Sequence, residues 1–149
     1  MTTADLALDR SMIALGIQQP WAELILRGIK TIEVRSQNTQ VRGTIYLYAS
    51  KKTSPLEAAR IAAAEHGIDV TTLPLGLLVG TIDLIDSRPC RPGDVRASCV
   101  TADLLVNHHA WILDNPRRFA QPQPVRFLPY GVWFYPFQRR SDASSRSQL

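Results

Sequence analysis

Short segments in which polar and apolar residues alternate place the strongest constraint on the fold of this chain. One of them, residues 28–35, begins at a glycine and continues in a strand-like pattern. Successive side chains of a strand point to opposite faces, so a period of two predicts a strand with one polar and one apolar face. The polar positions are Thr31, Glu33 and Arg35, and the apolar positions are Ile32 and Val34. Residues 44–50 alternate in the same way and predict a second strand.

Glycine, proline and capping residues divide the rest of the chain into further short elements. Pro20 suits the first position of a helix that ends at Gly28. Ser54 and Pro55 suit the cap and the first position of a second helix. The body of this second helix is expected at residues 56–66, and a further short helix at residues 101–108. Further strands are expected at residues 12–17, 76–85, 109–113 (closed by Asn115 and Pro116) and 131–137, with an irregular connection at residues 87–98.

The order of these elements favours an α+β domain on a curved or barrel-like sheet, because strands and helices do not alternate regularly. A chain of 149 residues suits one domain. We expect this domain to span residues 12–138. It would follow a flexible N-terminus at residues 1–11 and precede a disordered polar tail at residues 139–149.

Positive charge is concentrated in one part of the chain. Residues 27–52 contain six Lys and Arg residues and a single acidic residue, Glu33, so they carry a formal charge of +5 in a chain whose net charge is +4. A local basic cluster on a nearly balanced body is typical of proteins that bind a phosphate or a polyanion. The alternative is a solvated strand rim whose Lys and Arg residues serve solubility.

The sequence carries no sign of membrane insertion or secretion. No apolar run approaches the ~20 residues that a membrane-spanning helix needs, and the first residues lack the pattern of a signal peptide. Cys90 and Cys99 fit no metal-ligand spacing, and the adjacent His108 and His109 would point to opposite faces of a strand. We therefore expect a cytoplasmic monomer with no metal, no other cofactor and no membrane contact.

The polar face of residues 28–35 is the candidate ligand site. Lys30 can reach this face from the turn and is suited to clamp a phosphate or, if desolvated, to act as a base or nucleophile. Arg35 suits bidentate binding of a phosphate or a base edge. Glu33 can orient both cations, accept a hydrogen bond from a base amino group, or carry a proton. A structural ion-pair network that only fixes the strand is the alternative.

Neutral residues near this face have two interpretations each. Trp21 can stack on a base or fill the core, and Tyr46 and Tyr48 can line a cleft or only cover the sheet. The side-chain amides of Gln18 and Gln19 can read base edges. The complete predicted ligand-binding set is Gln18, Gln19, Trp21, Lys30, Thr31, Glu33, Arg35, Tyr46, Ser50, Lys51 and Lys52, of which Lys30 and Glu33 are catalytic if the protein is an enzyme.

Several separated blocks occur in an order that resembles one family. The blocks are Gln19-Pro20-Trp21-Ala22, Gly28-Ile29-Lys30, Glu33-Val34-Arg35, Arg42-Gly43, Ala49-Ser50, residues 80–86 and residues 111–118. In this pattern the chain resembles the ASCH domain, a PUA-like β-barrel, over nearly its whole length apart from the termini. The resemblance implies a small barrel with two or three flanking helices and a cleft lined by the Gly-x-Lys-x-x-Glu-x-Arg region.

The resemblance also implies binding of RNA, another single-stranded nucleic acid or a nucleotide, in RNA metabolism or transcription-coupled regulation. One bacterial branch of the family hydrolyses the amide of N4-acetylated cytidine with a lysine, a threonine and a glutamate. Lys30 matches that lysine, whereas Glu33 stands in the place of the threonine. Ribonuclease activity is proposed for other members. The hypotheses are therefore a nucleic-acid-binding module, a hydrolase or ribonuclease, and a protein-interaction scaffold without a ligand.

Overall fold

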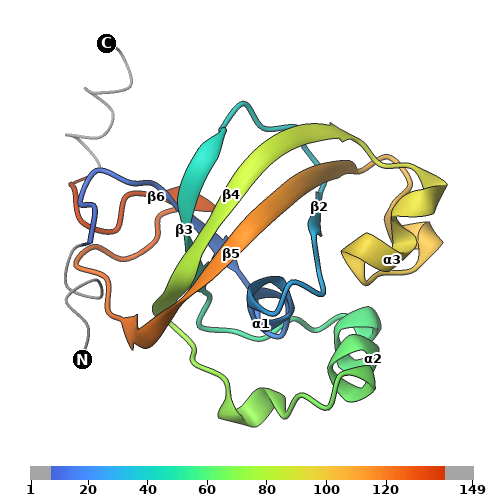
Figure 1. Cartoon of the computed structure of the whole chain (residues 1–149), viewed down its shortest axis with the longest axis horizontal. Helices are drawn as coiled ribbons and strands as arrows, with labels where there is room; N and C mark the ends of the chain where they lie inside the picture. The colour runs from blue at the N-terminus through green and yellow to red at the C-terminus, as the bar shows by residue number, and fades with distance from the viewer. Residues whose placement is uncertain (1–7, 140–149) are drawn as a thin grey trace.

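A curved six-stranded sheet with helices at its open ends forms the body of the protein (Figure 1). The computed structural model describes residues 8–139. Its strands are β1 (Ala14–Ile17), β2 (Ile32–Arg35), β3 (Gly43–Ala49), β4 (Leu77–Pro89), β5 (His109–Gln123) and β6 (Trp133–Phe134). The α-helices within this range are α1 (Trp21–Leu26), α2 (Glu57–Glu65) and α3 (Val95–Ser98). The predicted α+β class is confirmed.

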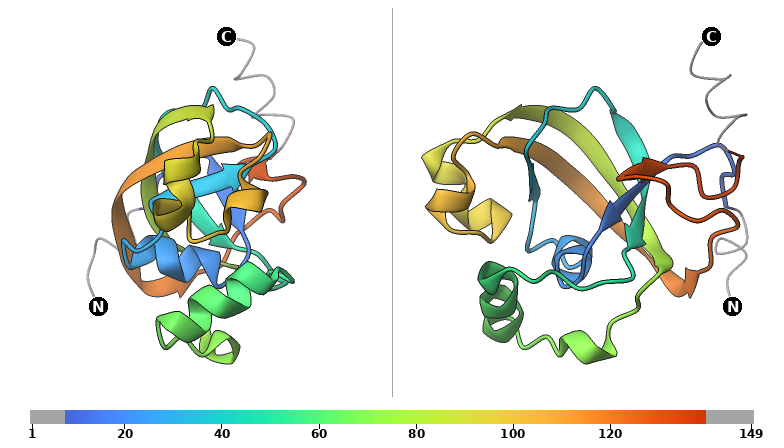
Figure 2. Two further views of the ribbon diagram at one scale, coloured as in Figure 1. Left: turned by 90° about the vertical axis from the view of Figure 1, so that its right-hand side faces the viewer. Right: turned by 180° about the vertical axis from the view of Figure 1, so that it is seen from behind.

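The sheet curls into a half-barrel whose two edge strands do not pair with each other. The strand order is β2-β5-β4-β3-β1-β6, in which β1 and β3 run parallel and the other neighbours antiparallel. Strand β2 therefore forms one edge and β6, paired with β1, forms the other. The right-hand view of Figure 2, which shows the molecule from behind, has these two edges facing each other. We call the gap between β2 and the β1–β6 edge the seam.

Strands β4 and β5 form a long hairpin that the sequence did not predict in full. Strand β4 continues to Pro89, where an irregular connection was expected, and β5 runs past Pro116 to Gln123. The expected strand end at Asn115 and Pro116 is wrong. The pairing of β4 with β5 shifts register at three places, and Asn115 takes a positive φ of 54°, which asparagine tolerates. The pairing of β5 with β2 ends at Ile112. Pro116, which has no N–H to donate, therefore interrupts no hydrogen bonds to a second neighbouring strand.

The helices follow the predicted order, with changes at their ends. Gly28 has a φ of 74° just after α1, as predicted, and Pro20 lies at the cap rather than inside this helix. Helix α2 is capped by Leu56, so the predictions of Ser54 as its cap and Pro55 as its first residue are wrong. The Ser54 hydroxyl instead accepts a hydrogen bond from the Leu56 N–H. The helix expected near residues 101–108 is only a 3₁₀ turn at Ala102–Leu104.

Two apolar clusters pack on opposite faces of β3. The larger one joins α1 and α2 to the inner faces of β1, β3, β4 and β5. A smaller cluster gathers Ala14, Tyr46, Tyr48, Leu78 and Phe134 near β6. The last strand, expected over residues 131–137, is confined to Trp133–Phe134, so the residues before it are free to form a loop beside the seam.

The terminal predictions fall largely beyond the described part of the chain. Residues 1–7 and 140–149 lie outside the described residues, so the flexible N-terminus and the disordered tail remain predictions. Within residues 8–139, no helix is long and apolar enough to cross a bilayer.

Candidate functional site

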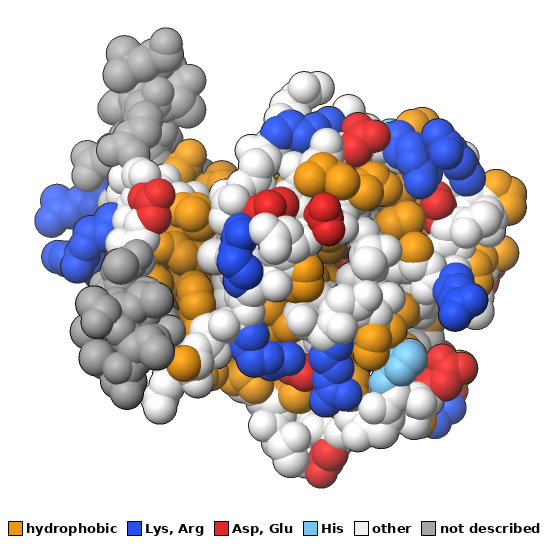
Figure 3. Space-filling view, in the orientation of Figure 1, with side chains coloured by type: hydrophobic (Ala, Val, Ile, Leu, Met, Phe, Trp, Pro, Cys, Tyr) orange, Lys and Arg blue, Asp and Glu red, His pale blue; other side chains and the backbone are white. Residues whose placement is uncertain are grey.

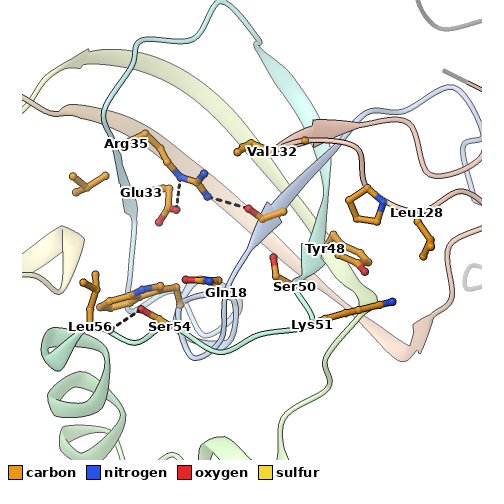
Figure 4. Close-up of a pocket in the computed structure, with 15 residues that line it drawn as sticks. Gln18, Glu33, Arg35, Tyr48, Ser50, Lys51, Ser54, Leu56, Leu128 and Val132 are labelled. Atoms are coloured by element: carbon orange, nitrogen blue, oxygen red, sulfur yellow. Dashed lines mark hydrogen bonds and ion pairs between the residues drawn. The ribbon is translucent and has the colours of Figure 1, made fainter. Parts of the chain in front are cut away.

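A cavity of about 650 Å³ opens at the seam of the half-barrel. Residues of β2, β1 and β3, of the start of α1 and of the loop that precedes β6 line it (Figure 4). Outside the strands its walls combine apolar and polar residues. The apolar ones are Trp21, Leu56, Leu128, Pro129 and Val132, and the polar ones are Gln18, Ser50, Lys51 and Ser54. A volume in this range is typical of small-molecule sites in proteins.

Arg35 bridges the seam from β2 to β1. Its Nε donates to Glu33 Oε2 at 2.8 Å, and its Nη2 donates to the carbonyl oxygen of Gly16 at 3.0 Å (Figure 4). The guanidinium also lies 5.6 Å from the ring centroid of Trp111, which in turn stacks on Trp133 of β6. The two edges are therefore held together by side chains. Glu33 and Arg35 both line the cavity, where they form an ion pair with each other.

Lys30 is buried behind the cavity wall. Its side chain is 2% exposed, its Nζ donates to the carbonyl oxygen of Ser98 at 2.5 Å, and this atom lies 3.6 Å from Glu33 Oε1. The ammonium also lies 4.6 Å from the ring centroid of Trp21. Burial lowers the pKa of Lys30, and the attraction of Glu33 only partly opposes this shift. Lys30 lines a second, smaller cavity of about 130 Å³ with Leu104 and His108.

Replacing Lys30 by methionine should flatten the alkaline stability profile. Between its lowered pKa in the folded state and its ordinary value of 10.5, the folded protein binds fewer protons than the unfolded chain. The free energy of unfolding contributed by Lys30 therefore rises with pH in this window. Urea denaturation from about pH 7 to about pH 10 should show the wild type gaining stability relative to Lys30→Met. Parallel profiles would contradict a buried, destabilised ammonium.

Strand β3 supplies a hydroxyl without a partner. Tyr48 is 2% exposed and lines the cavity, and its hydroxyl oxygen has no hydrogen-bond partner among the described residues. Burial raises the pKa of Tyr48. The ring packs edge-on against Phe134 with centroids 5.1 Å apart, so its position is fixed. Ser50 and Lys51 follow on the same wall, as Figure 4 shows.

Of the two tyrosines on this strand face, the structure places Tyr48 on the cavity and Tyr46 away from it. The Tyr46 hydroxyl donates to the carbonyl oxygen of Asp9 at 2.8 Å, and its ring meets Phe119 and Phe137. The N-terminal segment covers Tyr46. Alternation along the strand identified the shared face but not what covers it.

Three other predicted ligand residues also lie away from the cavity. Gln19 is buried, accepts a hydrogen bond from the Glu23 N–H and donates to the carbonyl oxygen of Pro74, so it fixes the start of α1. Thr31 is exposed beside α3, where its N–H donates to the Ala97 carbonyl oxygen. Lys52 is exposed next to the cavity residue Lys51. The predicted residues that do line the cavity are Gln18, Trp21, Glu33, Arg35, Ser50 and Lys51.

No pattern in the sequence indicated the loop side of the cavity. Leu128, Pro129, Gly131 and Val132 come from a connection whose packing depends on where β6 pairs with β1. Among the described residues, no three acidic, histidine or cysteine side chains converge as metal ligands would.

A model of the ASCH domain family matches residues 15–123, which include most of this site. The chain belongs to the ASCH domain family. The predicted PUA-like fold is confirmed as a half-barrel with three α-helices in its described part.

Relatives of this ASCH domain are found among both curated proteins and solved structures. It is 42% identical over 126 residues to mouse activating signal cointegrator 1, and 43% identical over 79 residues to the human protein. These alignments cover 80% and 48% of this chain, but it spans only 21% and 14% of those relatives. The structure of ASCH from Zymomonas mobilis superposes with a TM-score of 0.55 at 16% identity, covering 95% of this chain and 96% of that one. A serine-to-alanine variant of that protein superposes similarly, with a TM-score of 0.56.

The basic cluster of this ASCH domain does not form one free patch. Arg27 pairs with Glu23, and Arg42 approaches Asp86. Glu23 also receives Arg118 from β5; burial would raise its pKa, but hydrogen bonds from Arg118 and Arg27 outweigh burial and lower it. On the face shown in Figure 3, Lys and Arg side chains are spread among acidic and apolar ones. Basic residues that are close in the sequence therefore do not form one surface, because carboxylates pair with some of them.

Proposed function

We propose that this ASCH domain binds single-stranded RNA, or another unpaired nucleic acid, in the seam cavity. The observation that carries the proposal is Tyr48, which lines the cavity and whose buried hydroxyl has no hydrogen-bond partner among the described residues. Burying a polar group without a hydrogen bond costs free energy, so such groups occur where a ligand completes the bond. Family membership supports a nucleic acid as this ligand.

The surroundings of Tyr48 suit one nucleotide of a strand. Trp21 and Leu128 offer apolar surfaces on which a base can pack, while Gln18 and Ser50 offer neutral polar groups. Lys51 lies at the rim with an exposed side chain, and Lys52 follows it. These two lysines are placed to meet the phosphates on either side of a bound nucleotide.

Replacing Tyr48 by phenylalanine should weaken RNA binding without harming the fold. Loss of one neutral hydrogen bond predicts roughly a fivefold to tenfold rise in Kd. The free energy of unfolding should stay unchanged or rise by about 1 kcal/mol, since the variant no longer buries an unpaired hydroxyl. Fluorescence anisotropy with a short labelled RNA of mixed sequence measures Kd, and urea denaturation measures stability.

Tyr46→Phe is the matched control, because it removes a hydroxyl from the same strand face away from the cavity. It should lose about 1 kcal/mol of stability with the bond to Asp9 and keep its RNA affinity. Equal RNA affinity of Tyr48→Phe and the wild type would remove the main support for this site. If the wild type binds no RNA, the function itself is wrong.

A hydrolase acting on a modified nucleoside, or a ribonuclease, is the second candidate. It is favoured by Lys30, whose pKa is lowered beside Glu33 in the smaller cavity. A deprotonated amine is the form that acts as a base or nucleophile. Incubation with N4-acetylcytidine and with RNA tests this function. Turnover that Lys30→Met leaves unchanged would exclude Lys30 from the chemistry.

We also propose that the protein is cytoplasmic. Cys90 and Cys99 are both free thiols in the structure, which agrees with a reducing compartment. Fractionation of the cells that express the protein tests this location.

A further inference from the structure

We infer that the seam cavity holds the base of an unpaired nucleotide by its Watson–Crick edge, while the phosphates stay outside. This inference rests on the proposed function and names the part of the nucleic acid that the site recognises. It depends on three features of the described residues: the state of the charges, the free edge of β2, and the shape of the walls.

The charges inside the cavity are already satisfied by one another. Glu33 contacts Arg35 through one carboxylate oxygen and approaches Lys30 through the other. Arg35 donates a further N–H to the carbonyl oxygen of Gly16. A phosphate entering here would have to displace Glu33 from Arg35 or sit beside its carboxylate. The interior therefore favours an uncharged group over an anion.

The free edge of β2 presents a main-chain donor and acceptor at the seam. The Leu113 N–H donates to the Thr31 carbonyl oxygen, so residues 31, 33 and 35 bond with β5. In an antiparallel pair the residues between them turn their N–H and C=O groups the other way. Val34 therefore directs both groups away from β5, and it is a residue of the cavity lining. A donor beside an acceptor is the arrangement that the Watson–Crick edge of a base complements.

The walls fit a flat group with a polar rim. Leu56 lies across the cavity from Leu128 and Val132 (Figure 4). Trp21 also lines the cavity, and all four residues present apolar surface. The neutral polar side chains of the lining are those of Gln18, Tyr48, Ser50 and Ser54. A base has apolar faces and a hydrogen-bonding edge, and so matches this combination.

Two consequences distinguish base recognition from backbone recognition. A base whose Watson–Crick edge is held by Val34 cannot be paired, so duplexes are excluded. Among the described residues, Lys51 and Lys52 are the cations placed to neutralise the phosphates of a base bound here. Log Kd against log salt should therefore have a slope of magnitude roughly 1 to 2, since each phosphate contact on a single strand contributes ~0.7. A strand held by its phosphates along the sheet would give a steeper slope.

The test compares three labelled oligonucleotides on the full chain by anisotropy: a uridine-rich RNA, the same strand with abasic residues, and the same strand carrying N3-methyluridine. We expect the abasic and methylated strands to bind at least tenfold more weakly than the unmodified RNA. Free uridine should shift the amide signal of Val34 in a ¹⁵N NMR spectrum, and inorganic phosphate should not.

Val34→Pro adds a test on the protein side. It removes the N–H at the seam and leaves the bonds between β2 and β5 intact, because this N–H faces away from β5. Val34→Ala shortens the side chain and keeps the N–H. A folded Val34→Pro should bind the unmodified RNA at least fivefold more weakly than Val34→Ala. Equal affinities would overturn the role of this edge, and the ligand series on the wild type remains decisive if the proline variant does not fold.

The outcomes separate the inference from the function on which it rests. If the abasic strand binds as tightly as the RNA, base recognition is wrong and RNA binding stands. If uridine shifts Val34 but no strand binds, base recognition stands and the function as an RNA-binding module is wrong. If neither binds, both are wrong.

Discussion

Replacing Glu33 by glutamine should reduce the free energy of unfolding by about 3 kcal/mol at neutral pH, because it leaves a buried ammonium without its carboxylate. Lys30 is 2% exposed and would retain only the Ser98 carbonyl oxygen as a described hydrogen-bond acceptor. The same change takes the carboxylate from Arg35, which bridges the seam. Urea denaturation followed by circular dichroism measures the loss.

Two further variants make this prediction specific. Glu57→Gln removes a carboxylate from an exposed pair with Arg60 and should change stability little, since solvent screens such pairs. The double variant Lys30→Met with Glu33→Gln should recover part of the loss, because the uncompensated charge is then gone. If Glu33→Gln is as stable as Glu57→Gln, the pair beside the cavity does not hold β2 in place. The polar side chains of β2 would then have no structural role and would serve ligand binding or catalysis.

Replacing Gly80 by alanine should destabilise the protein by at least about 3 kcal/mol, the upper part of the range for overpacking. A Cβ atom at this position of β4 would overlap the carbonyl oxygen of Arg117 on β5 and lie 2.9 Å from Leu26 Cδ2 of α1. The first contact is with the main chain, so a change of side-chain rotamer cannot relieve it. A fall in Tm on the order of 10 °C is expected, measured by differential scanning calorimetry.

Gly93→Ala is the matched control for this substitution. Apart from Gly93 itself and its neighbours in the chain, no heavy atom lies within 4 Å of the position that its Cβ would take. Its effect should stay within about 0.5 kcal/mol, as for most surface substitutions. Equal Tm values for the two variants would show that β4, β5 and α1 adjust to the added methyl group. The register shifts of the hairpin would then not be fixed by close packing.

The sequence predicted the local elements best where two signals agreed. For β2, alternation and the preceding Gly28 both indicated a strand after a helix end, and the strand lies at Ile32–Arg35. For β5, Asn115 and Pro116 indicated a turn, but the strand continues through them. Its pairing with β4 and the absence of a neighbour on its other side decide this, and neither can be read from local composition.

The candidate site was predictable in its polar floor and not in its upper wall. Glu33 and Arg35 reach the cavity because a strand of period two carries them there. Lys30 lies close by, but its burial against Ser98 depends on where α3 packs. Leu128 and Val132 line the cavity only because β6 returns to pair with β1, a contact between residues about 120 positions apart in the chain.

The seam has a consequence for how such a site diversifies. The width of the cavity is set by a guanidinium, a pair of stacked indoles and a surface loop, whereas the ladders of the sheet lie elsewhere. Substitutions at these few positions can admit a larger or smaller ligand without displacing the strands. One inherited scaffold can thus accommodate ligands of different size, and its folding need not be solved anew for each of them.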